Sequence, residues 1–182
     1  MRAGDELAFG ELVERYQPRL LRLAGTFVGS RDLVEDIAQE TWLAVFRGVD
    51  RFEGRSSFRT WLFQICANRA RSIAVRERRI VPVEDVTRVA DRPVFAADGS
   101  WETPPDPWAD EAGDRAELVA AVQTAIVALP LTQRQVITLR DVEGLSAEEV
   151  CEVLMLSDGN QRVLLHRARL RVRAALGTVV SR

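Results

Sequence analysis

The residues best suited to chemistry lie between positions 51 and 79, where arginines and aromatic side chains interleave. Aromatic rings stack on unpaired bases and guanidinium groups pair with phosphates, so this composition suits the binding of single-stranded nucleic acid. The residues of the pattern are Arg51, Phe52, Arg55, Phe58, Arg59, Trp61, Phe63, Arg69, Arg71, Arg76, Arg78 and Arg79. The alternative is a helix with Trp61 in its core and arginines that are merely solvated.

A helix is expected to carry the second part of this stretch, after the polar loop EGRSS. Ser57 is placed to cap it, because a serine before the first helical residue can accept a hydrogen bond from a backbone N–H of the first turn. One row of this helix, flanked by Gln64 and Arg71, consists of Trp61, Ile65, Asn68 and Ser72. The row offers a stacking surface followed by hydrogen-bonding side chains.

An amphipathic helix is expected just before the loop, from Asp32 to about Gly48. Its buried stripe is Val34, Ile37, Ala38, Thr41 and Val45. The opposite side presents Asp36, Gln39, Glu40 and Leu43. Two carboxylates around an amide and a leucine suit docking on a partner protein, whereas the simpler interpretation is a solvated helix face.

The segments before and after these two helices are predicted to form part of the core and a linker, respectively. Residues 5–28 are predicted to be helical and to pack as core, with Pro18 breaking or kinking the run. Residues 81–113 hold five of the seven prolines, and residues 81–115 carry three arginines against nine acidic side chains. An acidic, proline-rich linker is predicted here. Its Phe95, Trp101 and Trp108 could dock on a partner or be incidental to a disordered tether.

Helical signals return after the linker. A helix is predicted over residues 116–129, and Pro130 ends it. Its apolar side is Leu118, Val119, Val122, Ile126 and Leu129. Thr132 and Gln135 have the spacing of a capping box, which predicts a helix through Asp141 that Gly144 closes.

The last part of the chain has the pattern of a helix-turn-helix. Ser146 and Glu149 have capping-box spacing and open a short helix with Val150, Val153 and Leu154 inward. After a turn at Met155 and Leu156, Ser157 caps an arginine-rich helix. The second helix of such a pair enters the major groove of DNA. The alternative is a small helical bundle whose arginines stay in solvent.

Composition argues against several classes of function. Of the 182 residues one is histidine and two are cysteine, Cys66 and Cys151, and no spacing resembles a metal site, a redox pair or a catalytic nucleophile. We therefore expect no catalytic residues, metal or cofactor, no enzyme activity, and two buried structural cysteines. No apolar run could span a bilayer and no leader suggests export, so a cytoplasmic protein is expected. The predicted fold is all-α, with domains at residues 1–80 and 114–182.

Two sets of motifs resemble one protein family. DIAQETWLAVFRG, followed by GRSSFRTWLFQI and NRAR, resembles the second domain of extracytoplasmic-function sigma factors, and ALP-LTQRQVITLRDVEGLS-AEEV with LHRAR resembles their fourth domain. The resemblance implies a bacterial transcription initiation factor that binds core RNA polymerase, selects promoters and melts the minus-ten element. Implied partners are the clamp helices of the polymerase largest subunit, the polymerase flap, promoter DNA and an anti-sigma factor, without direct membrane insertion.

The resemblance also implies three sites. Polymerase would bind Asp36, Gln39, Glu40 and Leu43. The minus-ten element would contact Phe52, Arg55, Ser56, Ser57, Phe58, Trp61, Asn68, Arg71 and Ser72. The minus-thirty-five element would contact Arg140, Asn160, Arg162, Val163, His166 and Arg167, while Arg169, Arg171 and Arg173 would serve phosphates or solvent.

The chain departs from the family pattern in the helix-turn-helix. Met155 stands where the family has glycine, and Gln161 replaces an apolar residue that should face the core. Val163 and Leu164 replace polar residues that should face DNA, and an aliphatic surface there would favour a thymine methyl group. Two other interpretations stay open: a polymerase-binding adaptor or inhibitor, favoured by these departures, and a plain helix-turn-helix regulator.

Overall fold

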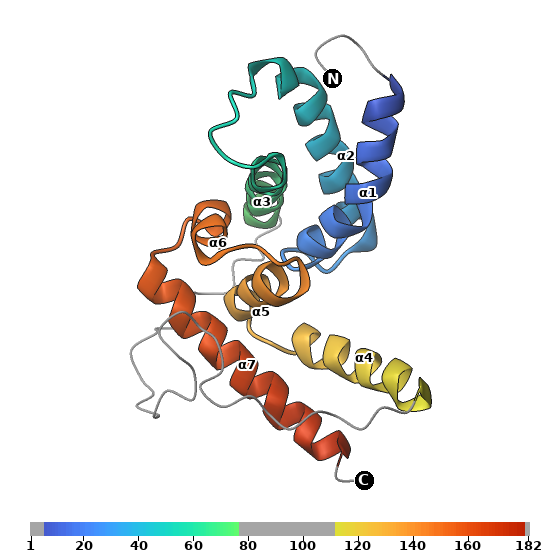
Figure 1. Cartoon of the computed structure of the whole chain (residues 1–182), viewed down its shortest axis with the longest axis vertical. Coiled ribbons are helices and arrows are strands. Elements are labelled where there is room, and N and C mark those ends of the chain that lie inside the picture. The colour runs from blue at the N-terminus through green and yellow to red at the C-terminus, as the bar shows by residue number, and fades with distance from the viewer. Residues whose placement is uncertain (1–5, 77–111, 181–182) are drawn as a thin grey trace. The chain divides into compact units, whose positions relative to one another are not determined.

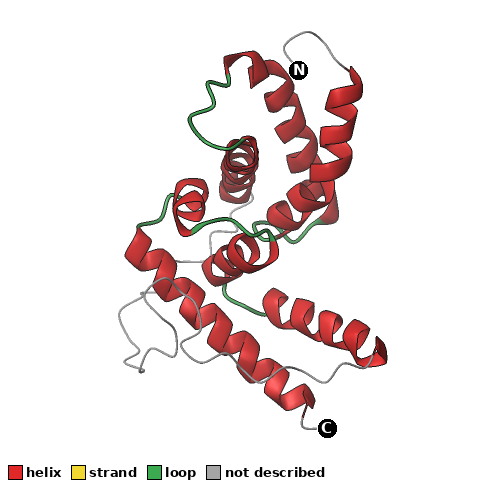
Figure 2. Cartoon of the chain, in the orientation of Figure 1, coloured by secondary structure: helices red, strands yellow, loops and turns green. Residues whose placement is uncertain are grey.

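The computed structural model describes residues 6–76 and 112–180, and the regular structure within these two ranges is entirely helical (Figures 1 and 2). The helices form two compact units, α1 to α3 in the first and α4 to α7 in the second, apart from Glu152–Met155. The all-α prediction is confirmed. Most of the predicted linker, with Phe95, Trp101 and Trp108, lies outside the described residues.

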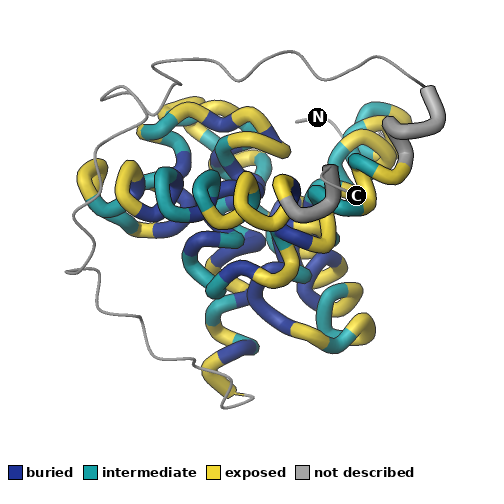
Figure 3. Tube along the Cα trace, turned by 90° about the horizontal axis from the view of Figure 1, so that it is seen from below, coloured by how far each residue is buried: buried dark blue, intermediate teal, exposed yellow. Residues whose placement is uncertain are grey.

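The first unit consists of α1 (Glu6–Gly25), α2 (Arg31–Gly48), a short 3₁₀ turn η1 (Val49–Arg51) and α3 (Phe58–Arg76). Each of the three α-helices packs on the other two, and α1 and α2 lie side by side in Figure 1. Side chains fully withdrawn from solvent include Leu20, Leu23, Ile37, Val45, Leu62 and Phe63. Figure 3 shows buried and exposed positions alternating around the helices, as amphipathic helices require.

The predicted buried stripe of α2 is confirmed, with Val34 only partly covered at its edge. The structure adds Trp42, which is buried and donates its indole N–H to Oε1 of Gln17 at 2.6 Å. A buried indole N–H needs such an acceptor. The bond joins α2 to α1, so it helps to fix the face that α2 turns outward.

Of the two effects expected at Pro18, a break or a kink, the break does not occur. One helix runs from Glu6 to Gly25 with Pro18 inside it. Proline removes one backbone hydrogen bond and crowds the preceding turn, at a cost of about 3 kcal/mol. Leu20 and Leu23 are completely buried just after it. Their burial against α2 and α3 offsets this cost, because tertiary packing supplies most of a helix's stability.

Three predicted helix caps are present. The Thr60 N–H donates to Ser57 Oγ at 3.1 Å, at the start of α3. The Ser146–Glu149 capping box is complete, since each backbone N–H donates to the other residue's side chain, at 2.8 and 3.1 Å. The Asn160 N–H donates to Ser157 Oγ at 3.3 Å. Local capping chemistry therefore determines where α3, α6 and α7 begin.

The second unit consists of α4 (Ala112–Val127), α5 (Leu131–Ile137), a π-helical turn η2 (Thr138–Val142), α6 (Ala147–Leu154) and α7 (Asp158–Val180). Helix α7 packs on α4 and α5. The core includes Ala125, Leu129, Val136, Leu139, Leu145, Val150, Leu165 and Ala168.

Two details of this unit differ from prediction. The Thr132 capping box does not form: α5 follows Pro130 without a side-chain cap, and Gln135 is buried in the core. Val119, expected on the apolar side of α4, is half exposed. Leu118, Val122 and Ala125 follow the inner side of that helix, and Leu129 is buried just after its end, whereas Val119 lies off this row.

Candidate polymerase and nucleic-acid interfaces

The outward face of α2 is as the sequence predicted. Asp36, Gln39, Glu40 and Leu43 are all exposed, opposite the buried stripe. Oε2 of Glu40 lies 3.8 Å from Nη1 of Arg69 on α3, and both side chains are about half exposed. Such an exposed pair contributes little to stability. The face therefore combines acidic groups with an exposed leucine. Its carboxylates contribute little to the stability of the fold and remain accessible to a partner.

Phe46 extends this face and was missed by the sequence analysis. It lies three residues beyond Leu43, so it continues the same row of α2. Its side chain is 67% exposed, a large fraction for an aromatic residue, and its ring meets Phe9 edge-on with centroids 5.8 Å apart. The spacing from Leu43 was the signal that could have identified it. We define the docking face as Asp36, Gln39, Glu40, Leu43 and Phe46.

The loop before α3 gathers an aromatic cluster. Phe52 and Trp61 lie 4.9 Å apart between ring centroids, and Phe58 is 6.2 Å from Phe52 and 5.9 Å from Trp61. Gly54 turns the loop with φ at +71°, a conformation that glycine adopts without strain. The cluster is only partly buried. It therefore brings together three residues that the sequence placed in one site and leaves their ring surfaces partly accessible.

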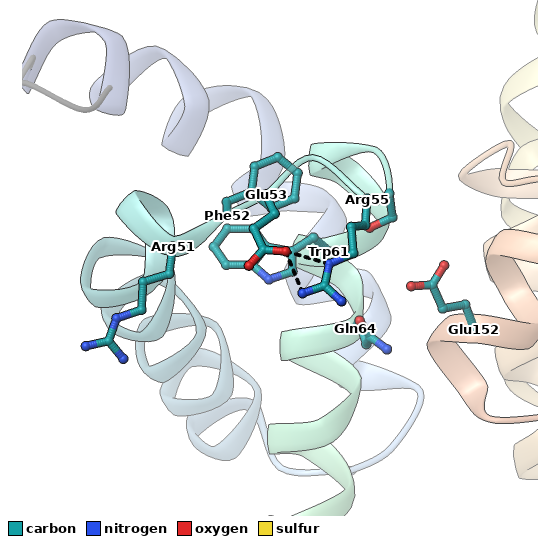
Figure 4. Close-up of a pocket in the computed structure, with 8 residues that line it drawn as sticks. Arg51, Phe52, Glu53, Arg55, Trp61, Gln64 and Glu152 are labelled. Carbon is teal, nitrogen blue, oxygen red and sulfur yellow. Dashed lines mark hydrogen bonds and ion pairs between the residues drawn. The ribbon is translucent and has the colours of Figure 1, made fainter.

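A surface hollow lies beside this cluster (Figure 4). Its floor includes Phe52 and Trp61, and Gln64 of α3 projects at its edge. Nε of Arg55 donates to Oε2 of Glu53 at 2.7 Å across the hollow. Arg51 extends away from that pair in the same view. The hollow thus offers an aromatic face with hydrogen-bond donors and acceptors around it, which suits a single planar base.

Further along α3, the hydrogen-bonding residues of the predicted row lie together. Asn68 and Ser72 are exposed. Nη1 of Arg71 donates to Oδ1 of Asn68 at 2.8 Å, and the Ser72 hydroxyl donates to the Asn68 carbonyl at 2.9 Å. These bonds hold Asn68 on the same row of α3 as Trp61, with Arg71 beside it.

The start of α7 presents the residues that the sequence assigned to a DNA groove. Val163 is exposed, and His166 and Arg167 are partly exposed. Arg162 is exposed too, and its Nε lies 3.3 Å from Oδ1 of Asp158 one turn earlier. Asn160 is partly buried, and its Oδ1 lacks a hydrogen-bond partner. The exposed members share one side of the helix.

The inner side of α7 corrects one expectation and supports another. Leu164 was expected to face DNA, but it is buried. It lies one turn after Gln161 and one turn before Ala168, on the row that faces the core. The family pattern predicted that position 161 faces the core, and Gln161 is indeed 1% exposed. Its Nε2 has no hydrogen-bond partner.

Three arginines of the second unit bind groups within that unit. Nη1 of Arg140 donates to the Leu145 carbonyl at 2.5 Å. Arg169 makes two hydrogen bonds to the Asp141 carboxylate, at 2.9 and 2.7 Å, and Nη1 of Arg171 donates to Oε1 of Gln133 at 3.0 Å. Arg169 therefore binds a carboxylate of its own unit and is largely withdrawn from solvent, contrary to expectation, whereas Arg171 is exposed and its expected role stays a prediction.

Met155 adopts the backbone conformation for which the family uses glycine. Its φ is +59°, between α6 and α7. A side chain in this left-handed region strains the backbone by roughly 1–2 kcal/mol. The departure in sequence therefore keeps the turn and adds strain to it.

The described residues were also compared with the predictions about metal sites, membrane spans and cysteines. Within residues 6–76 and 112–180, no three His, Cys, Asp or Glu side chains converge to hold a metal ion. None of the helices described there is both long and apolar enough to cross a bilayer. Cys66 is buried, but Cys151 is partly exposed, so the prediction of two buried cysteines is correct only for Cys66.

Comparison with known proteins agrees with this geometry. Residues 12–80 match the Sigma-70 region 2 family and residues 120–172 match the Sigma-70 region 4 family. The chain is 36% identical over 173 residues to the RNA polymerase sigma-H factor of Pseudomonas aeruginosa, covering 95% of this chain and 88% of that protein. It is 35% identical over 166 residues to the ECF RNA polymerase sigma-E factor of Escherichia coli K12, covering 91% and 85%. The chain belongs to the extracytoplasmic-function sigma factors.

Solved structures share the fold of this sigma factor. The structure of CnrH in complex with the cytosolic domain of CnrY aligns with a TM-score of 0.61 and 26% identity, covering 97% of this chain and 92% of that one. The sigma factor RpoE of Bartonella quintana, in complex with the anti-sigma factor NepR, aligns with a TM-score of 0.56 and 23% identity, covering 93% and 97%. As a member of the family, the protein is a transcription initiation factor, and sigma factors are not themselves catalysts.

Proposed function

We propose that this sigma factor binds core RNA polymerase through the docking face of α2, and reads and melts promoters through the hollow beside Trp61 and the start of α7. It performs no covalent chemistry and works in the cytoplasm, where bacterial RNA polymerase acts. The observation that carries the proposal is the pairing, within one compact unit, of an exposed acidic and apolar face on α2 with a partly open aromatic cluster at the start of α3.

The docking face suits the clamp helices of the polymerase largest subunit. Interface hot spots combine an aromatic or aliphatic anchor with a polar surround. Leu43 and Phe46 supply the anchor, at 47% and 67% exposure, and the two carboxylates and the amide supply the surround. The expected partner surface is therefore a helix pair with an apolar groove and basic side chains opposite Asp36 and Glu40.

The hollow suits one base flipped from the non-template strand of the minus-ten element. The base would stack on Trp61 and Phe52, a contact worth about 1–3 kcal/mol. Glu53, Arg55, Ser56 and Gln64 surround it with hydrogen-bonding groups. Capture of a flipped base would hold the strands apart, which is how the element melts without any covalent step.

The start of α7 suits the major groove of the minus-thirty-five element. Arg162 could exchange its bond to Asp158 for two bonds to a guanine, worth about 1–3 kcal/mol of discrimination. Val163 fits a thymine methyl group. Arg140, Asn160, His166 and Arg167 complete the proposed contacts, although Arg140 also binds the Leu145 carbonyl.

We also propose the domain boundaries 1–80 and 114–182, with a linker over 81–113. The two family matches support them, since they end at residue 80 and resume at residue 120. Helix α4 begins slightly earlier than the proposed boundary, at Ala112. An anti-sigma factor is a further proposed partner, supported by the complex of RpoE with NepR.

Run-off transcription on fragmented genomic DNA with bacterial core polymerase tests the proposal. Transcripts should appear only when the protein is added, and they should share sequence upstream of their start sites.

Substitutions separate the three proposed contacts. Asp36→Arg should abolish polymerase binding and leave the fold intact. Trp61→Ala should spare polymerase binding and impair opening, and Arg162→Ala should relax preference at one upstream base pair. Polymerase binding without any new transcript would contradict the proposal and indicate an adaptor or inhibitor.

A further inference from the structure

We propose that single-stranded promoter DNA leaves the hollow beside Trp61 along an aromatic path and makes a second contact on α1, with Arg15, Tyr16 and Arg19. The inference rests on the proposed binding of the minus-ten strand. It adds a site on a helix that the sequence analysis treated only as core. We call Arg15, Tyr16 and Arg19 the α1 contact.

The aromatic path is continuous within the first unit. From Trp61 it passes to Phe58, at 5.9 Å between ring centroids, and from Phe58 to Tyr16, again at 5.9 Å. Phe58 and Tyr16 meet edge to face, with their planes at 66°. Tyr16 and Phe58 are both partly exposed, so this path is not closed core. Successive partly exposed rings are the surface on which unpaired bases stack.

Two cations stand at the far end of the path. Cζ of Arg15 and Cζ of Arg19 each lie 5.7 Å from the centroid of the Tyr16 ring, within cation–π range. Arg15 is exposed and Arg19 is partly exposed. A guanidinium held over a ring loses less conformational freedom when it pairs with a phosphate than a freely rotating one does. The α1 contact thus combines the ring and the charges that a nucleotide requires.

The chemistry favours a single strand over a duplex. In a duplex the bases are stacked on one another, and only their edges and the backbone are available to a protein. The rings of Trp61, Phe58 and Tyr16 can make use of base faces, which only an opened strand exposes. The α1 contact is therefore expected to act after melting, on nucleotides next to the flipped base.

The test measures binding of single-stranded DNA to the holoenzyme by fluorescence anisotropy. The short probe is the non-template minus-ten element of a promoter found by run-off transcription. Two extended probes add four thymidines to it, one at the 5′ end and the other at the 3′ end. The Arg15→Gln, Arg19→Gln double variant should bind the short probe normally. It should bind the better of the extended probes about tenfold more weakly, with its salt slope reduced by about 1.4 for two lost phosphate contacts.

Arg31→Gln is the matched control. Arg31 is an exposed arginine of the same unit, paired with Glu35 at the beginning of α2 and not part of the aromatic path. It should leave binding of all probes unchanged. Thermal melting of each variant checks that the fold survives. An equal loss on short and extended probes, or no loss, would overturn the α1 contact.

A second readout uses the fact that Tyr16 is the only tyrosine of the chain. Ring-labelled tyrosine should give one NMR signal, which should shift with an extended probe and stay in place with the short one. An unmoved signal would overturn the inference.

Trp61→Ala separates this inference from the proposed function. If Trp61→Ala weakens binding of all probes while the arginine double variant weakens binding of none, only the α1 contact fails. If it weakens none, the minus-ten site itself fails.

Discussion

Gln161 is a polar side chain in an apolar position. It is 1% exposed on the inner side of α7, and its Nε2 has no hydrogen-bond partner. An amide group without a partner in the core costs roughly 1–3 kcal/mol relative to water. The sigma factor therefore carries a local weakness in α7, the helix proposed to read the upstream element.

Replacement of this side chain should stabilise the protein. Gln161→Leu is expected to raise the free energy of unfolding by about 1–2 kcal/mol, because it removes the unsatisfied amide and keeps a similar volume. Urea denaturation measures the change. Gln123→Leu, at an exposed position of α4, is the control and should have little effect. Destabilisation by Gln161→Leu would mean that the amide has a partner, such as a buried water.

Phe46 should be an anchor of polymerase binding. Phe46→Ala is expected to weaken binding of core polymerase by about 2 kcal/mol, because an exposed aromatic anchor becomes buried in the complex. Stability of the free chain should change little, since the side chain is 67% exposed. Affinity can be measured with labelled protein. Val75→Ala, at a half-exposed position of α3, is the control, and equal affinity of both variants would remove Phe46 from the docking face.

Among the elements of the second unit, η2 and α7 are joined by an ion pair between Asp141 and Arg169. Arg169 is 16% exposed and grips the Asp141 carboxylate with two hydrogen bonds. A π-helical turn lacks the regular hydrogen bonds of an α-helix and is often placed where geometry matters for function. The pair therefore adds a polar link between η2 and α7 to the apolar packing of α7 on α4 and α5.

A double-mutant cycle measures this pair. Asp141→Asn and Arg169→Gln should each destabilise the protein, and their coupling energy should be about 1 kcal/mol, since the pair is bidentate and partly buried. The same variants should reduce preference for the minus-thirty-five element without affecting polymerase binding. Arg162 and Asp158, an exposed pair on one helix, should show smaller coupling. Coupling near zero for Arg169 would make the pair incidental.

At the scale of the molecule, the two cysteines report on folding. Burial raises the pKa of the Cys66 thiol to about 12. Burial, with the nearby Asp158 carboxylate, also raises the pKa of Cys151, which remains partly exposed. The thiolate is the reactive form, so reactivity at a given pH follows both pKa and access.

Alkylation by iodoacetamide at pH 8 should therefore modify Cys151 slowly and Cys66 only after unfolding. Mass spectrometry after timed labelling gives both rates. Because the folded pKa of Cys66 lies above its unfolded value, the unfolded state loses its proton first as pH rises. Stability should fall between about pH 9 and pH 12, and that loss should be smaller in Cys66→Ala. Equal labelling of both cysteines in the native protein would contradict the prediction.

Local sequence determined much of this protein. The spacing of apolar residues in α2 was enough to predict both its buried stripe and its outward face, because one turn of helix places residues three and four apart on the same side. Ser57, Ser146 and Ser157 were enough to predict three helix starts, because a cap and its partner lie within three residues. These features need no information from distant parts of the chain.

Tertiary structure decided the rest. Pro18 stays inside a helix because α1 packs on both α2 and α3. Leu164 is buried because its row of α7, with Gln161 and Ala168, faces the core of the second unit. Arg169 meets Asp141 from 28 residues away, and Tyr16 reaches Phe58 from the opposite helix of its unit. Such contacts depend on how helices pack, and side chains distant in sequence meet only where packing brings their helices together, which no short stretch of sequence encodes.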